Sequence, residues 1–501
     1  MRGPSVHRPA DRGPHWRLPD NPNLAWLRSR VEELQQRYAA GDSEAVELVS
    51  GDDPSSPRRL PLAHAQRVLA RALGFAGWAE LRDHLATIER YSRWPEPFAD
   101  DRSEPEPTDL LRLACLSYTR WRVADLRAAA ELVAAGGLAT DAWTLAATGR
   151  ADDLARLLGE HPELADTEGG PYRWPPLLYL CYARLGAQRG DPVRTARVLL
   201  TAGADPDAGY LWHGLTSPFT ALTGAFGGGE RAEPPHPDSS ELARVLLDAG
   251  ADPNDNQTLY NRMFTPADDH LRLLLPYGLG TARPSVWRDR LGSAYPSSAE
   301  MVGEQLRSAA ERGFIGRVRV LLEHRVDPNT TGYHPILGDQ NAYEVAVRSG
   351  HREIAALLAA AGGRSDRLDA VDLLLADLLS GTDVSADPEL IGEAVRRQPA
   401  ALADAVAHGQ DAALPLLLAH GFDVNGSAHG RRTALHLAAI ECRPAIAGWL
   451  LDHGADPTSR DREHDATPAG WAAYAGHREL ALLLDPVPAA DPPSTTAKSG
   501  A

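Results

Sequence analysis

The sequence predicts an all-α protein, a solenoid of short helix–turn–helix repeats with a small separate helical domain at its N-terminus. Two recurring blocks predict this fold. The first begins with Thr and continues with Leu and Ala at helical spacing, as in residues 433–438 and again from residue 467. The second is rich in Leu and ends in a Gly-containing turn, as in residues 243–254. Such a unit buries its apolar side only by stacking on neighbouring units.

Copies of these blocks cover most of the chain. The first block starts at residues 141, 175, 220, 265, 304, 341, 400, 433 and 467. The second block occupies residues 196–207, 243–254, 318–329, 414–425 and 447–458. The first-block intervals of 45, 45 and 59 residues place insertions in the middle of the array. Because residues 367–385 are Leu-rich and lie in the longest interval, we expect one further degenerate helix pair there, and nine or ten repeats in all.

The residue types within one repeat suit the backbone positions that the fold requires. Thr433 can accept a hydrogen bond from an unpaired N–H at the start of the first helix. Pro468 suits the first helical position, where no donor is needed. Gly454 suits the left-handed position that ends the second helix. Asp456 and Pro457 then form a turn that leads to the next repeat.

These motifs resemble ankyrin repeats. The family motif Thr-Pro-Leu-His-x-Ala is matched by residues 433–438, with Ala434 in place of Pro. The Thr-Pro pair recurs at residues 467–468, and Gly-Ala-Asp recurs at residues 203–205, 250–252 and 454–456. The resemblance covers residues 141–485 and is firmest over 400–485. It implies that a protein partner binds to the concave face of the array and to the finger loops beside it.

The rest of the chain is assigned by composition. We expect a disordered tail over residues 1–22, a helical module over 23–92, an acidic Pro-rich linker over 93–108, a repeat array with capping helices over 109–485, and a disordered tail over 486–501. Residues 65–81 resemble a small helical module that precedes ankyrin arrays in some bacterial proteins. The abundance of Arg, Ala, Gly and Pro is also typical of a bacterial genome rich in G and C.

Charge and rare residues exclude several function classes. The only lysine of the 501 residues is Lys498, so phosphate-binding loops, protein kinases and Schiff-base enzymes are excluded. A net charge of −17 disfavours nucleic acid and anionic membranes as partners. The three cysteines are isolated, which does not suit a disulfide framework or a zinc site. With neither a secretory signal nor a membrane span, we expect a cytoplasmic protein. We also expect a monomer.

No catalytic motif is present, so we expect no enzyme activity, no cofactor and no metal site. His436 and His477 occupy repeat positions, and we expect them to be structural. The alternative is an enzyme-linked effector or regulator whose activity lies in residues 24–138 and is not identified by any motif.

Aromatic residues in two insertions are candidates for partner binding. Tyr172, Trp174, Tyr210, Trp212 and His213 precede the first helices of two consecutive repeats, where the finger loops of an ankyrin-like array lie. Aromatic anchors are typical of protein interfaces. The alternative is that these side chains pack under the insertions as a satellite core.

Charged residues supply the second set of candidates. Arg431, Arg432, Arg460 and Arg462 lie in the last two fingers, where they could contact an acidic or phosphorylated partner or simply be solvated. Residues 365–425 contain 11 acidic residues and three arginines, a net charge of −8. This stretch could attract a basic partner, or it could serve solubility.

Overall fold

The computed structural model describes residues 18, 22–53, 56–57, 59–96, 105–119, 122–186, 190–333, 337–427 and 432–485. Most of the two predicted tails, the centre of the predicted linker, Lys498 and Arg431 therefore lie outside the described residues. The chain divides into two compact units. Unit 1 comprises residues 1–305 and 332–338, and unit 2 comprises residues 306–331 and 339–501.

Unit 1 begins with four helices that have a core of their own. Buried Leu27, Leu34, Leu69 and Leu81 belong to this core. The helices are α1 (Leu24–Ala39), α2 (Ser43–Asp52), α3 (Leu62–Ala72) and α4 (Trp78–Tyr91). The sequence predicts helices here, and the structure contains them.

The N-terminal helices are joined to the repeats of unit 1 by a small sheet. Strand β1 (Ser92–Arg93) follows α4 directly and pairs in parallel with β2 (Gly209–Trp212), which pairs antiparallel with β3 (Pro218–Thr220). Tyr91 also packs edge-on against Trp287, with ring centroids 5.2 Å apart. The insertion over residues 209–218 is therefore a hairpin that holds the end of α4, a pairing that was not predicted from the sequence.

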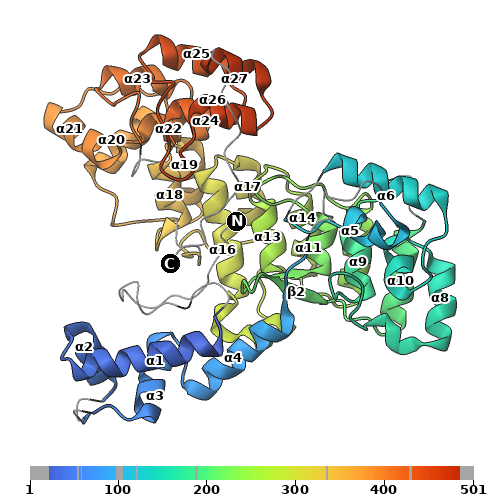
Figure 1. The fold of residues 1–501 in the computed structure, drawn as a ribbon. Coiled ribbons are helices and arrows are strands. Elements are labelled where there is room, and N and C mark those ends of the chain that lie inside the picture. The colour runs from blue at the N-terminus through green and yellow to red at the C-terminus, as the bar shows by residue number, and fades with distance from the viewer. Residues whose placement is uncertain are drawn as a thin grey trace. The chain divides into compact units, whose positions relative to one another are not determined.

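The repeats of unit 1 are pairs of antiparallel helices. Figure 1 shows α9, α11 and α13 side by side, as their packing contacts require. The helices are α5 (Leu110–Ala114), α6 (Val123–Ala135), α7 (Ala142–Ala147), α8 (Ala151–Glu160), α9 (Pro176–Tyr182), α10 (Pro192–Thr201), α11 (Ala221–Phe226), α12 (Ser239–Asp248), α13 (Asn256–Arg262), α14 (Asp269–Leu274) and α15 (Val286–Leu291). Residue 265 does not begin a first helix. That helix is α13, which Asp255 caps by accepting from the N–H of Thr258 at 2.8 Å.

Unit 2 continues the same pattern, and α16 begins in unit 1 and ends in unit 2. Its helices are α16 (Ser298–Glu311), α17 (Ile315–Glu323), α18 (Ala342–Arg348), α19 (Arg352–Ala360), α20 (Ala370–Leu379), α21 (Pro388–Arg397), α22 (Ala401–Ala407), α23 (Ala413–Ala419), α24 (Ala434–Ile440), α25 (Pro444–Asp452), α26 (Pro468–Tyr474) and α27 (Arg478–Leu484). Helices α20 and α21 are the degenerate pair that the Leu-rich stretch predicts. The predicted all-α repeat fold is confirmed.

His436 is structural, as predicted. Its side chain is fully buried, and its Nδ1 accepts from the N–H of Thr433 at 3.1 Å and lies 2.8 Å from the Thr433 hydroxyl. Its Nε2 donates to the carbonyl of Ala466, 3.1 Å away in the next finger. One imidazole therefore caps α24 and ties it to the following repeat, which is why a polar ring lies inside an apolar stack.

At three places in the described array, an asparagine side chain clamps one finger to the next. The Nδ2 of Asn425 donates to the carbonyl of Gly454 at 3.1 Å, and its Oδ1 accepts from the N–H of Asp456 at 2.8 Å. The equivalent clamps are Asn329 on Gly362 and Arg364, and Asn254 on Thr281 and Gly280. We call this arrangement the finger clamp. It explains why Asn follows Asp-Pro or Asp-Val at these positions of the repeat.

A second series of hydrogen bonds joins the turns between paired helices. The side chain after each turn donates to a carbonyl at the end of an earlier first helix. The pairs are His351 with Glu311, Gln410 with Ser349, Arg443 with Val406, and His477 with Ile440. The bond from His477, at 3.1 Å, gives this residue the structural role that its repeat position predicts.

Candidate functional site

Three of the predicted aromatic residues belong to the core of unit 1. Tyr172, Trp174 and Tyr210 are 3%, 0% and 1% exposed. The ring of Trp174 lies 4.7 Å from that of Tyr172 and 4.8 Å from that of Tyr210, measured between centroids. The hydroxyl of Tyr179 holds the insertion closed, since it accepts from the N–H of Tyr172 and donates to the carbonyl of Gly169. In this conformation the three rings are satellite core and are not accessible to a partner.

The other two predicted aromatic residues lie at the end of β2 and are half-buried. Trp212 donates from Nε1 to the carbonyl of Ser117 at 3.1 Å, and its ring centroid is 4.0 Å from that of His213. The ring centroid of Trp94 lies 6.2 Å from that of His213, and Trp94 is 51% exposed. We call Trp94, Trp212 and His213 the aromatic edge.

The backbone presents the aromatic edge in a constrained conformation. His213 has φ of 51°, a left-handed conformation that is unusual for a residue with a side chain. Its N–H donates to the carbonyl of Arg93 at 3.0 Å, which holds it beside β1. Trp94 was not predicted from the sequence because it falls in the acidic Pro-rich stretch, and the pairing of β1 with β2 brings it beside His213.

The finger arginines do not act as one group. Arg432 lies over the ring of Trp471, 5.1 Å from its centroid, and Arg460 donates to the carbonyl of Asp465 at 2.5 Å. Arg462 is exposed, and Arg431 lies outside the described residues. Two of the four are thus engaged within unit 2, while a role for Arg462 in partner binding stays a prediction.

Much of the acidic stretch over residues 365–425 is neutralised by ion pairs. Asp372 pairs with Arg348 at 3.2 Å, Asp377 pairs with Arg352 at 3.1 Å, and Asp411 pairs with Arg443. All three arginines lie outside the stretch, so a count along the sequence overstates the local charge. Asp369 also pairs with Arg397 inside it, at 2.7 Å.

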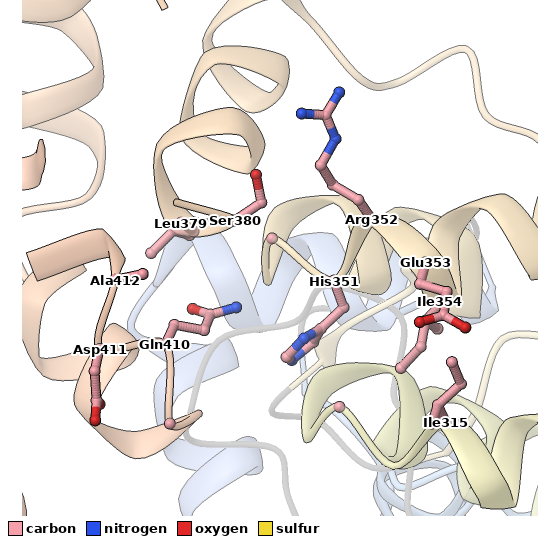
Figure 2. A pocket seen from close by; sticks show the side chains of 13 residues that line it. Ile315, His351, Arg352, Glu353, Ile354, Leu379, Ser380, Gln410, Asp411 and Ala412 are labelled. Carbon is pink, nitrogen blue, oxygen red and sulfur yellow. The ribbon is translucent and has the colours of Figure 1, made fainter. Parts of the chain in front are cut away.

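A cleft of about 510 Å³ lies where the turns of unit 2 meet (Figure 2). We call it the turn pocket. His351 and Gln410 approach its centre from different turns, Leu379 and Ser380 end α20 above it, and Ile315 begins α17 beside it. Its remaining lining residues are Gly313, Gly350, Arg352, Glu353, Ile354, Gly409, Asp411 and Ala412.

The alternative prediction places an enzyme-linked activity in the N-terminal helices, and a cluster of titratable groups lies there around Asp52. The carboxylate of Asp52 accepts from Arg67 at 3.0 Å and Arg71 at 2.5 Å, and His64 lies 3.3 Å away. Burial opposes the charged form, but the guanidinium groups of Arg71 and Arg67 hold the pKa of Asp52 below its usual range. The cluster ties α2 to α3, which is a structural role.

In the part of the chain that the structure describes, no group of three or more His, Cys, Asp or Glu side chains is placed to hold a metal ion. The described helices also include none that combines the length and the apolar character needed to cross a membrane.

The stacked helix pairs, the finger clamps and the bonded turns define a repeat protein whose units are held by their neighbours. Residues 358–461, from the end of α19 through α25 to the following finger, match the family model of ankyrin repeats in three copies. The chain therefore contains ankyrin repeats over residues 358–461. Ankyrin repeats are in general protein–protein interaction modules.

Proposed function

We propose that this protein is a non-catalytic scaffold that binds a protein partner through the fingers and the concave face of its ankyrin array. The observation that carries the proposal is the aromatic edge. Trp94 exposes half of its surface beside Trp212 and His213, and tryptophan is the residue type most enriched at energetically important interface positions.

The constrained backbone supports the same proposal. The left-handed conformation at His213 persists because β1 and β3 flank β2 and fix the hairpin. A rigid surface loses little conformational entropy on binding, so more of the contact energy becomes affinity. We further propose that the protein acts as a cytoplasmic monomer and binds neither nucleic acid nor a cofactor.

The test is cross-linked affinity capture from a cell lysate with the wild-type chain, Trp94→Ala and a matched control. Tyr474→Ala is suitable as the control because Tyr474 is an aromatic residue of similar exposure in unit 2. We expect the wild type and Tyr474→Ala to recover the same protein in similar amounts. Trp94→Ala should recover at least tenfold less of it. Equal recovery with all three chains, at equal helicity by circular dichroism, would remove the aromatic edge from the binding surface.

A further inference from the structure

We propose that the turn pocket of unit 2 recognises a basic side chain, arginine or lysine, of a protein partner. This inference does not rest on the aromatic edge, because the pocket is lined only by residues of unit 2 and would recognise different chemistry. It rests on two hydrogen-bond acceptors that belong to residues lining the cleft and on the charges of the lining residues.

The first acceptor is Nδ1 of His351. The ring's other nitrogen, Nε2, lies 3.0 Å from the carbonyl of Glu311. Because a carbonyl can only accept, Nε2 carries the hydrogen. Burial lowers the pKa of His351, and the hydrogen bond to Glu311, which raises the pKa, only partly offsets this. The ring is therefore neutral at pH 7. A neutral ring protonated at Nε2 leaves a lone pair on Nδ1, and Figure 2 shows the ring pointing into the cleft.

The second acceptor is the amide oxygen of Gln410. Its Nε2 lies 2.5 Å from the carbonyl of Ser349, which fixes the orientation of the amide, since only the nitrogen can donate. Its Oε1 is buried and has no hydrogen-bond partner among the described residues. A buried acceptor without a donor is costly, and a donor brought by a ligand would remove that cost.

The charges around the cleft favour a cation over an anion. The lining holds two carboxylates, those of Asp411 and Glu353, against one guanidinium, and each carboxylate is also paired, Asp411 with Arg443 and Glu353 with Arg319 at 2.8 Å. Arg352 lines the cleft as well, but it is held by Asp377 at 3.1 Å and Thr382 at 3.0 Å. Figure 2 shows its guanidinium turned away from His351. Helix dipoles contribute little, because helices of both polarities end here.

The size of the cleft suits one long side chain together with the peptide segment that carries it. Ligand sites are commonly 300–1,000 Å³, and the turn pocket, at about 510 Å³, lies within this range. An arginine has five N–H donors and a lysine has three, and either can reach two acceptors at once while keeping its charge near the acidic rim. Glutamine offers the same length with two donors and no charge, so it is the appropriate comparison ligand.

The test is a titration of the full chain, labelled at ¹³Cε1 of histidine, with N-acetyl-arginine amide and N-acetyl-lysine amide. The His351 resonance is assigned from its absence in His351→Gln. We expect this resonance to shift and to saturate with at least one basic probe, and N-acetyl-glutamine amide to bind at least fivefold more weakly. Failure of both basic probes to shift it saturably, tighter binding of N-acetyl-glutamate amide, or equal shifts of all histidine resonances would overturn the proposal.

A charge variant provides the control. Gln410→Lys places an ammonium group in the cleft, and we expect it to weaken binding of the basic probe at least tenfold. Gln36→Lys makes the same change at an exposed position of α1 and should leave the affinity within twofold of the wild type. Unchanged resonances of His436 and His477 verify that each variant is folded. Wild-type affinity in Gln410→Lys would contradict the proposal.

Discussion

Replacing Asn425 with alanine should loosen the end of the array. The change removes both hydrogen bonds of one finger clamp, to Gly454 at 3.1 Å and from Asp456 at 2.8 Å. Both hydrogen bonds are exposed, so water can take the place of the lost partner. Each bond therefore contributes about 0.5–1.5 kcal/mol to stability. Without the clamp, opening of the terminal pair α26 and α27 should become about 1–2 kcal/mol easier, since a repeat is held only by its neighbours.

Amide hydrogen exchange measured peptide by peptide is the suitable assay, because it reports local opening. A decrease of about 1–2 kcal/mol in the opening free energy corresponds to about 5–30-fold faster exchange in residues 468–484. Thr458→Ala is the matched control. Thr458 has the same position one repeat later and donates to Asp456 within its own turn. Wild-type exchange in Asn425→Ala, or an equal effect of Thr458→Ala, would refute the clamp.

Three further predictions follow from buried polar groups. His436→Ala removes the cap of α24 and the bond to Ala466, and the urea midpoint of unit 2 should fall by the equivalent of about 3 kcal/mol. Arg184 is buried and donates to the carbonyls of Gly224 and Pro234, so Arg184→Met should speed exchange in residues 227–238 by more than tenfold. Burial, with the charges of His351 and Arg312, lowers the pKa of His408 to about 4. Since the unfolded state then binds the proton more readily, unit 2 should lose about 3 kcal/mol as pH falls from 7 to 4, and His408→Gln should flatten that dependence in urea melts.

The repeats could be predicted from sequence because their signals are local. Thr433, Pro468 and Gly454 are placed by the backbone conformations of a cap, a first turn and a left-handed helix end. These requirements involve neighbouring residues only, so they leave a pattern along the chain. The Leu-rich run that becomes α20 is another such pattern.

Elements that depend on distant partners could not be predicted. Strand β1 has two residues, and only its pairing with β2, over a hundred residues away, makes it a strand. The first helix of this repeat, α13, begins at Asn256 and is capped by Asp255. The Thr-Pro pair at residue 265 instead lies just before the second helix, α14. The repeat motif was present in sequence but belonged to a different part of the unit.

The candidate sites show the same division. Composition indicated aromatic residues in the fingers, but burial separates Tyr210 from Trp212, two residues further along the chain. Alternation in a strand places Tyr210 and Trp212 on the same face of β2, near Phe219. Tyr210 is buried because Trp174 stacks on it, whereas Trp212 is the last residue of the strand. The turn pocket has no sequence signal, because it forms where Gln410 reaches Ser349, 61 residues earlier.

The most direct test of the binding account is the exchange footprint of the captured partner on the full chain. If the partner binds the aromatic edge, residues 92–96 and 209–220 should be protected in the complex, and Trp94→Ala should lose that protection. Protection confined to residues 24–91, with residues 209–220 exchanging as in the free protein, would show that the partner binds the N-terminal helices and not the aromatic edge.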